Sequence, residues 1–364
     1  MTRPIKRIGV LTGGGDCPGL NAVIRAVTKT AIYKYGLEVY GIEDGALGLI
    51  HNRIAPLSVE RVRDILLLGG TILGTSNNAN PKHFPVHQKG TIQHVDVSDR
   101  MLDHIKVNRL DAIVTIGGDG TQSMAHELVQ EGVNCIGVPK TIDNDIMHCE
   151  QTFGFDTAVT TSTECLDKIH TTAMSHDRVM VVEVMGRNAG WLALHAGVAS
   201  GSDILLLPEI PFDFEKIGEA LETRRKNGRT FTILCVSEGA KEKGGSQVIQ
   251  RHVEGSPDPV RLGGIGTVVA DEIEKRFGLD TRCTILGHIQ RGGTPTPFDR
   301  SLATRYGYEA IETLMAGEQG QLVVWREGTV NRVPIESVAH QQRKVPLEHP
   351  LIAAARAVGT SFGD

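Results

Sequence analysis

The chain has 364 residues, of which 38 are Lys or Arg and 43 are Asp or Glu, giving a formal net charge of −5 at pH 7. Hydrophobic residues make up 40% of the chain, enough for a large buried core, whereas aromatic residues make up only 4%. A net-negative chain with no basic block and few stacking side chains is not typical of proteins that bind nucleic acids or anionic membranes. Because no apolar run reaches about 18 residues and no cysteines form a CxxC pair, we expect no membrane span and reduced thiols in the cytoplasm.

Short hydrophobic runs alternate with amphipathic stretches along the chain. The runs predict strands at residues 7–12, 38–42, 111–116, 134–138, 179–184, 204–207, 230–236 and 283–286. The amphipathic stretches predict helices at residues 22–35, 59–68 and 123–130, and polar segments predict loops at 75–91 and 242–259. Continuous apolar runs are typical of strands covered on both faces, so the alternation indicates an α/β protein with parallel sheets.

Two segments, residues 8–16 and 113–120, each join a hydrophobic strand to glycines and an aspartate. Their likeness predicts two strand-to-helix turns side by side in one sheet, where backbone N–H groups and helix N-termini form an anion site. Asp119 lies among the glycines of the second turn, where it would repel a phosphate unless a divalent cation lay between them. We therefore predict that Asp119 anchors Mg²⁺, with a helix-capping aspartate as the alternative.

Acidic residues follow the strand predicted at 134–138. If the chain stays extended there, the side chains of Thr141, Asp143 and Asp145 point the same way. One carboxylate at a strand end can accept a proton from an attacking hydroxyl, and the Lys140 ammonium suits phosphate oxygens. The alternative is a solvated acidic turn.

Basic side chains gather at the ends of predicted strands. They are Arg178, Arg187, Arg282, Arg291 and His288. Arginine binds phosphate oxygens in bidentate fashion, so the group predicts a pocket for a phosphorylated small molecule in a net-negative protein. Any one of these residues taken alone is better explained as a solvated surface side chain, and the prediction rests on their shared position at strand ends.

Six motifs occur in a specific order and spacing: GGGDCPGLN (13–21), GGDGT (117–121), PKTIDND (139–145), VVEVMGR (181–187), SEG (237–239) and LGHIQRGGTPTPFDR (286–300). Together they resemble the 6-phosphofructokinase family over nearly the whole chain. GGDGT alone also resembles NAD kinases and diacylglycerol kinases, but those families do not account for the other motifs. The resemblance implies two Rossmann-like three-layer α/β/α lobes with mainly parallel sheets. It implies a larger nucleotide lobe (1–154 plus about 290–340) and a smaller fructose 6-phosphate lobe (155–289 plus about 341–364).

The resemblance also implies roles for individual residues. The donor nucleotide, with Mg²⁺ at Asp119, would lie against Gly15, Asn77, Asn78, Gly118, Asp119, Gly120 and Thr121. Asp143 would be the catalytic base. Fructose 6-phosphate would be bound by Thr141, Asp143, Arg178, Met185, Gly186, Arg187, Glu238, Arg282, His288 and Arg291. Among these residues, Arg178 and Arg282 would come from a neighbouring subunit of a homo-oligomer, usually a tetramer.

The phosphoryl donor depends on two positions, Gly120 and Lys140. Family members that use pyrophosphate usually carry Asp at the first position and Lys at the second, so this chain resembles a mixed-substrate group of the phosphofructokinase A type. Glycine leaves room for the nucleotide α-phosphate, and we therefore favour ATP over pyrophosphate. Asn77 and Asn78 stand where well-known bacterial ATP enzymes place Arg, a charge that Lys140 is expected to replace. A non-catalytic sugar-phosphate sensor remains a third alternative.

Overall fold

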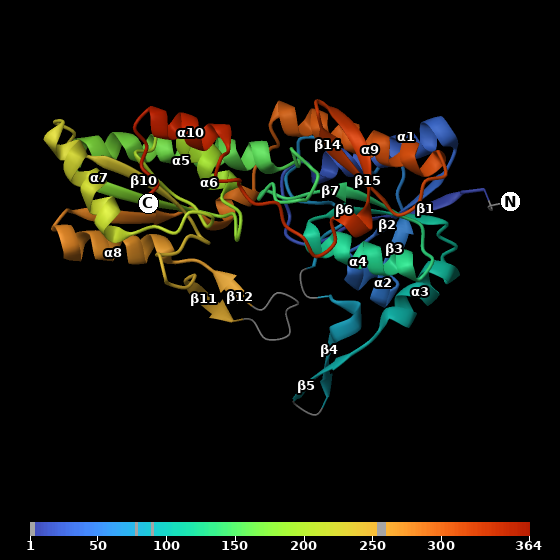
Figure 1. Cartoon of the computed structure of the whole chain (residues 1–364). Helices are drawn as coiled ribbons and strands as arrows, with labels where there is room; N and C mark the ends of the chain where they lie inside the picture. The colour runs from blue at the N-terminus through green and yellow to red at the C-terminus, as the bar shows by residue number, and fades with distance from the viewer. Residues whose placement is uncertain (1–3, 77–78, 89–90, 253–259) are drawn as a thin grey trace.

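The computed structural model describes residues 4–76, 79–88, 91–252 and 260–364, which form two lobes, each built around one β-sheet (Figure 1). The larger sheet has the spatial order β15 (Thr329–Pro334), β14 (Gln321–Arg326), β7 (Cys135–Pro139), β6 (Ala112–Gly117), β1 (Arg7–Thr12), β2 (Glu38–Ile42) and β3 (Ile54–Pro56). Its five inner strands are parallel, and the edge strands β15 and β3 are antiparallel to their neighbours.

The smaller sheet is entirely parallel, with the order β13 (Thr281–Ile285), β8 (Val179–Val184), β10 (Thr232–Ser237) and β9 (Ile204–Leu206). Every residue of the inner strands β6, β8 and β10 is buried. These strands were predicted from continuous apolar runs, which follow from coverage on both faces. The prediction of an α/β fold with mainly parallel sheets is confirmed.

Helices cover both faces of each sheet. In the larger lobe, α1 (Leu20–Tyr35) and α9 (Pro297–Met315) pack together on one face, and the other face carries α4 (Asp119–Gln130), α2 (Ala46–His51) and α3 (Ser98–Val107). In the smaller lobe, α5 (Phe155–His176), α6 (Trp191–Ala199) and α10 (Pro350–Ala357) lie opposite α7 (Phe214–Lys226) and α8 (Ile265–Phe277). Of the helices in the described parts of the chain, none combines the length and apolar character that a bilayer span requires.

The buried core is continuous between the lobes. One cluster of buried apolar side chains runs through the larger lobe and includes Trp191, Val182 and Leu205 of the smaller lobe. A second cluster, which includes Val181 and Leu234, fills the other face of the smaller sheet. The division of the chain between lobes at particular residues stays a prediction.

The helix predicted at residues 59–68 is wrong, because this segment forms successive turns. The side-chain amide of Asn21 donates hydrogen bonds to the carbonyls of Leu68 and Gly69, and its oxygen accepts one from the Ile72 N–H. This tertiary contact holds the chain in a conformation that its apolar spacing did not indicate, and Leu67 and Leu68 are about half exposed.

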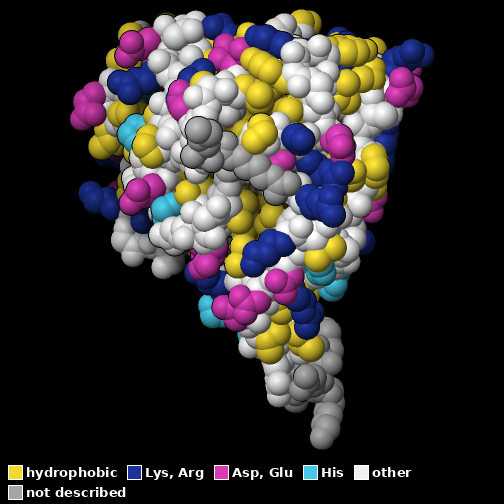
Figure 2. All heavy atoms as spheres, turned by 90° about the vertical axis from the view of Figure 1, so that its right-hand side faces the viewer, with side chains coloured by type: hydrophobic (Ala, Val, Ile, Leu, Met, Phe, Trp, Pro, Cys, Tyr) yellow, Lys and Arg dark blue, Asp and Glu magenta, His cyan; other side chains and the backbone are white. Residues whose placement is uncertain are grey.

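Two hairpins extend from the lobes on the same side (Figure 1). One pairs β4 (Phe84–Gln88) with β5 (Thr91–Val95), and the other pairs β11 (Ile249–His252) with β12 (Val260–Leu262). The loops predicted at 75–91 and 242–259 are therefore wrong for the strand residues, whereas 253–259 lie outside the described residues. In Figure 2 the β4–β5 hairpin stands off the body as a narrow projection. A strand exposed in this way needs no apolar run, so its polar sequence indicated a loop.

Candidate active site

The two glycine turns open side by side onto one cavity of about 760 Å³. They follow β1 and β6, which are parallel neighbours with Val10 opposite Val114. The turns also contact each other, because a Cβ atom on Gly13 would lie 2.5 Å from Thr121 Oγ1. Only a glycine permits this approach, so the two predicted anion turns form a single surface.

The first turn of α4 lines the cavity with Gly118, Asp119, Gly120 and Thr121. The unpaired N–H groups and the dipole at a helix N-terminus favour phosphate there. Asp119 does not cap the helix, since no side chain accepts a capping hydrogen bond at this end. Its Oδ2 atom instead accepts a hydrogen bond of 3.2 Å from Gln342 Nε2.

Lys140 is buried between the two turns, where its ammonium group donates a hydrogen bond to the Gly15 carbonyl. Its backbone N–H donates to the Gly117 carbonyl at 3.1 Å. Burial lowers the pKa of Lys140. The structure thus brings this predicted donor-side cation into the cavity wall beside Gly15 and α4.

The acidic segment departs from the extended conformation that we predicted. Asn144 has a φ of 52°, and the Asp143 N–H donates a hydrogen bond to Thr141 Oγ1, which interrupts the alternation of side chains. Asp143 and Asp145 nevertheless both line the cavity, and they are only 6% and 5% exposed. The segment is therefore not a solvated turn.

The surroundings of the two aspartates differ. Burial raises the pKa of Asp145 to about 8, and the neighbouring charge of Asp143 contributes to this rise. Burial also raises the pKa of Asp143, but Arg291, Arg187 and Lys140 oppose the rise. Three neighbouring cations therefore favour the ionised form of Asp143, whereas at Asp145 the charges of Asp143 and Asp119 favour the protonated form. In addition, Asp143 Oδ1 is buried without a hydrogen-bond partner among the described residues.

The smaller lobe contributes Arg187, which follows β8 and lines the cavity. Its backbone has a φ of 48°, and its N–H donates a 3.0 Å hydrogen bond to Glu238 Oε1. Glu238 follows β10, the parallel neighbour of β8. A Cβ atom on Gly239 would lie 1.6 Å from the Arg187 carbonyl oxygen. The SEG motif thus fixes the position of the arginine loop.

Replacing Glu238 with glutamine is expected to stabilise the ligand-free protein in a pH-dependent manner. Burial, followed by the charge of Asp143, raises the pKa of Glu238 from 4.5 to about 7. Between these values the folded chain keeps a proton that the unfolded chain has lost, so the free energy of unfolding falls as pH rises. Glutamine does not ionise but can still accept the Arg187 hydrogen bond.

Urea denaturation at pH 5 and pH 8 measures this effect. We expect Glu238→Gln to exceed the wild type by up to roughly 3 kcal/mol at pH 8, with little of this difference at pH 5. An equal difference at both pH values would contradict the assignment.

Arg291 lies in the short helix η2 (Gly287–Arg291) and lines the cavity, where its Nη1 atom donates a 3.1 Å hydrogen bond to the Asp16 carbonyl. The remaining predicted sugar-phosphate ligands of this region do not line the cavity. They are Met185, Gly186, Glu238 and His288, of which His288 is exposed. Asn77 and Asn78 lie outside the described residues.

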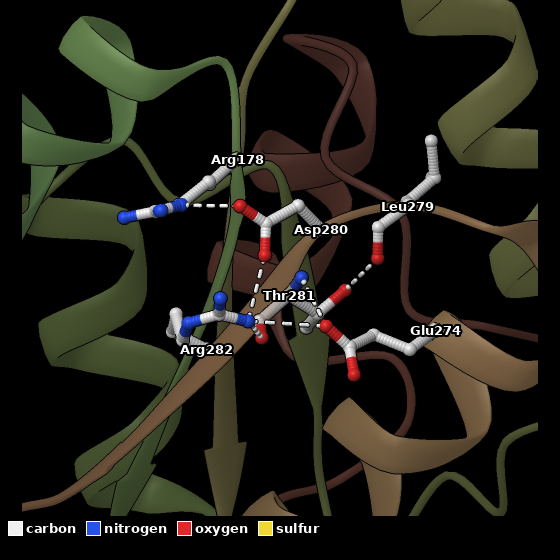
Figure 3. Close-up of polar contacts among 6 residues, drawn as sticks. All are labelled: Arg178, Glu274, Leu279, Asp280, Thr281 and Arg282. Carbon is white, nitrogen blue, oxygen red and sulfur yellow. Dashed lines mark hydrogen bonds and ion pairs between the residues drawn. The ribbon is translucent and has the colours of Figure 1, made fainter.

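Arg178 and Arg282 lie away from the cavity and share one counter-ion, Asp280 (Figure 3). Arg178 Nε is 2.5 Å from Asp280 Oδ2, and Arg282 Nη1 is 2.6 Å from Asp280 Oδ1. Arg282 also pairs with Glu274 at 3.1 Å. Both guanidinium groups are partly exposed, and neither lines the cavity.

Several residues that line the cavity carried no recognisable motif. They are Ser76, Asn80, Glu127, Arg261, His340, Gln342 and Lys344. Within the described ranges no group of three or more His, Cys, Asp and Glu side chains could hold a metal ion by itself. The Asp119 carboxylate at the N-terminus of α4 is the kind of ligand that Mg²⁺ combines with substrate phosphates.

Comparison with known proteins identifies the family. The family model for phosphofructokinase matches residues 7–314. The chain belongs to the phosphofructokinase family. It is therefore a phosphotransferase with an alcohol acceptor.

Three relatives illustrate the match to phosphofructokinases. The chain is 48% identical to ATP-dependent 6-phosphofructokinase 2 of Clostridium perfringens over the full length of both proteins. It is 44% identical to the pyrophosphate–fructose 6-phosphate 1-phosphotransferase of Amycolatopsis methanolica, covering 94% of this chain and 97% of that protein. The solved phosphofructokinase of Saccharomyces cerevisiae is 32% identical with a TM-score of 0.77, covering 92% of this chain and 45% of that chain.

Proposed function

We propose that the chain transfers the γ-phosphoryl group of ATP to the 1-hydroxyl of fructose 6-phosphate. The position of Asp143 is the main observation that supports this proposal. The buried carboxylate of Asp143, whose Oδ1 finds no hydrogen-bond partner in the described residues, lies in a cavity that the α4 N-terminus lines from one lobe and Arg187 from the other. A sugar hydroxyl at that point would lie between the proposed donor-phosphate site and the Arg187 side chain.

The donor is assigned to the larger lobe, against Gly15, Gly118, Gly120 and Thr121. Asp119 would hold Mg²⁺, which when bound would neutralise charge on the donor phosphates. The sugar phosphate is assigned to Thr141, Arg187 and Arg291, with Met185, Gly186, Glu238 and His288 next to them. Arg178 and Arg282 are assigned to the site of a neighbouring subunit in a tetramer, which their distance from their own cavity supports.

Asp143 acts as the general base in this reaction. It accepts the proton of the sugar 1-hydroxyl while that oxygen forms a bond to the γ-phosphorus, and the bond from the γ-phosphorus to the β–γ bridging oxygen breaks. The products are fructose 1,6-bisphosphate and ADP, and the proton passes from Asp143 to solvent. Arg187, Arg291 and Lys140 place positive charge around the reacting phosphoryl group, which lowers the barrier by preorganised electrostatics.

ATP is the proposed donor because of the space beside Gly120. Among the residues that the structure describes, none lies within 4 Å of a Cβ atom built at this position, which supports space for a nucleotide α-phosphate. An aspartate here would place negative charge into that space. Relatives at 48% and 44% identity are named for ATP and for pyrophosphate respectively, so a direct comparison of donors is the deciding experiment.

The test is a coupled assay for fructose 1,6-bisphosphate with ATP and pyrophosphate in parallel. We expect turnover with ATP in the wild type, and Gly120→Asp is expected to lower kcat/KM for ATP at least about tenfold through repulsion of the α-phosphate. Gly120→Asn, similar in size but neutral, is expected to retain more ATP activity. If the wild type turns over with pyrophosphate but not with ATP, the assignment of ATP as donor is wrong. If it turns over with neither donor, the proposed function is wrong.

The cytoplasm is the proposed location. All six cysteines are free thiols, which supports a reducing compartment. Cell fractionation followed by an immunoblot tests this assignment.

A further inference from the structure

A segment near the C-terminus crosses between the lobes at the cavity. Residues 338–345, called here the crossing segment, connect η3 (Ile335–Ser337) beside α4 to α10 in the smaller lobe (Figure 1). Within it, the His340 N–H donates to Ser123 Oγ of α4 at 3.1 Å. The Val345 N–H donates to Glu209 Oε1, after β9 of the smaller lobe, at 2.9 Å. The segment is therefore fixed to both lobes.

The crossing segment also places one side chain on the predicted metal ligand. Gln342 Nε2 donates to Asp119 Oδ2 at 3.2 Å, while Gln342 Oε1 accepts a 3.4 Å hydrogen bond from Asn188 Nδ2. Asn188 Oδ1 in turn accepts from Gln247 Nε2 at 3.1 Å, and the same Gln247 nitrogen donates to the Gly239 carbonyl at 3.0 Å. Three side-chain amides thus join Asp119 of the larger lobe to the Arg187–Gly239 region of the smaller lobe.

The direction of this relay is fixed at both ends. Asp119 offers only acceptor oxygens when ionised and the Gly239 carbonyl is also an acceptor, so each end requires an amide NH₂ group. Placing Nε2 of Gln342 on Asp119 leaves its oxygen for Asn188, and placing Nε2 of Gln247 on Gly239 leaves its second hydrogen for Asn188. Asn188 satisfies both neighbours, because its Nδ2 donates to Gln342 and its Oδ1 accepts from Gln247. A single orientation of all three amides therefore satisfies every contact.

We propose that the Gln342–Asn188 pair is a latch between the lobes that positions the Asp119 carboxylate and couples donor binding to sugar-phosphate binding. This inference rests on the function proposed above. Asn188 is the residue after Arg187, so a sugar phosphate that orders the Arg187 loop also orders the latch. Gln342 is then held on Asp119, and the carboxylate is presented to the magnesium–nucleotide complex in one orientation. Such coupling is reciprocal, since each ligand strengthens the other by the same factor.

The latch is tested by calorimetric titration of the full-length protein with AMP-PNP, a non-hydrolysable ATP analogue, with Mg²⁺ or with EDTA, and with or without fructose 6-phosphate. We expect Gln342→Ala and Asn188→Ala each to weaken magnesium–AMP-PNP binding roughly 3–10-fold. Both should also reduce the enhancement by fructose 6-phosphate, and the double variant should lose no more than about one single variant. Binding in EDTA should change little, because Asp119 then has no cation to bind.

Gln341→Ala is the matched control. Its exposed side chain lies next to Gln342 in the chain, and its binding should equal that of the wild type. Wild-type affinity and wild-type coupling in both latch variants would overturn the latch, as would equal losses in Mg²⁺ and in EDTA. If the wild type turns over fructose 6-phosphate but the latch variants keep wild-type binding and coupling, the latch alone is refuted. A wild type that binds neither ligand refutes the proposed function and the latch together.

Discussion

Replacing Asp143 with alanine is expected to lower kcat by a factor of about 10²–10⁴ while fructose 6-phosphate still binds. The loss follows from removal of the buried oxygen that has no hydrogen-bond partner within the described parts of the chain and that is assigned to accept the hydroxyl proton. Steady-state kinetics gives kcat, and titration of the purified variant with fructose 6-phosphate gives the affinity. Unchanged turnover in Asp143→Ala would refute its assignment as base.

Asp145→Asn is the matched control for this experiment. Because burial and the charge of Asp143 raise the pKa of Asp145 to about 8, this side chain is largely protonated at pH 7, and an amide resembles that neutral form. We expect Asp145→Asn to retain most of its turnover at pH 7. A loss as large as that of Asp143→Ala would mean that the two carboxylates share the proton-transfer role.

A single methyl group at Gly239 is expected to disable the sugar-phosphate side of the cavity. In Gly239→Ala the new Cβ atom would lie 1.6 Å from the Arg187 carbonyl oxygen, so the arginine loop must move. A lost hydrogen bond to a charged group costs about 1.5–3 kcal/mol, which corresponds to a rise of at least about tenfold in KM for fructose 6-phosphate. KM for ATP should change much less, because the glycine turns belong to the other lobe.

Comparison with Arg187→Ala separates this effect from general damage. If Gly239→Ala acts by displacing Arg187, the two single variants should resemble each other and the double variant should be hardly worse than either. Near-additive losses would show that Gly239 acts through another contact. A wild-type KM for fructose 6-phosphate in Gly239→Ala would contradict the proposed contact directly.

The parts of the fold that the sequence predicts best are those covered by other elements. The strands β1, β2 and β8 match their predicted bounds, because burial on both faces requires an unbroken apolar run. The β4–β5 hairpin is not covered on both faces and needs no apolar run, so its polar residues indicated a loop. The segment 59–68 ends at Leu68, whose carbonyl accepts a hydrogen bond from the Asn21 amide 47 residues away in the chain, a contact that no local pattern reveals.

The residues of the candidate site also fall into those that the sequence predicts and those that it does not. Asp119 and Asp143 follow β6 and β7, which are parallel neighbours in one sheet, so strand prediction alone brings them together. Arg187 follows β8 of the other sheet and joins them only because the two lobes pack together. Gln342 and Arg261 reach the cavity from a crossing segment and from a hairpin, neither of which carries a motif. The position of these two side chains at the cavity depends on how the lobes are joined, which long-range packing decides.

The continuous core between the lobes limits how the enzyme can move. Side chains such as Trp191 and Leu205 belong to the same cluster of buried apolar residues that fills the larger lobe. Two halves packed in this manner cannot swing widely apart without opening a void, which dense interiors resist. Substrate capture is therefore expected to proceed by slight sliding of one half over the other, a shear displacement rather than the opening of a hinge.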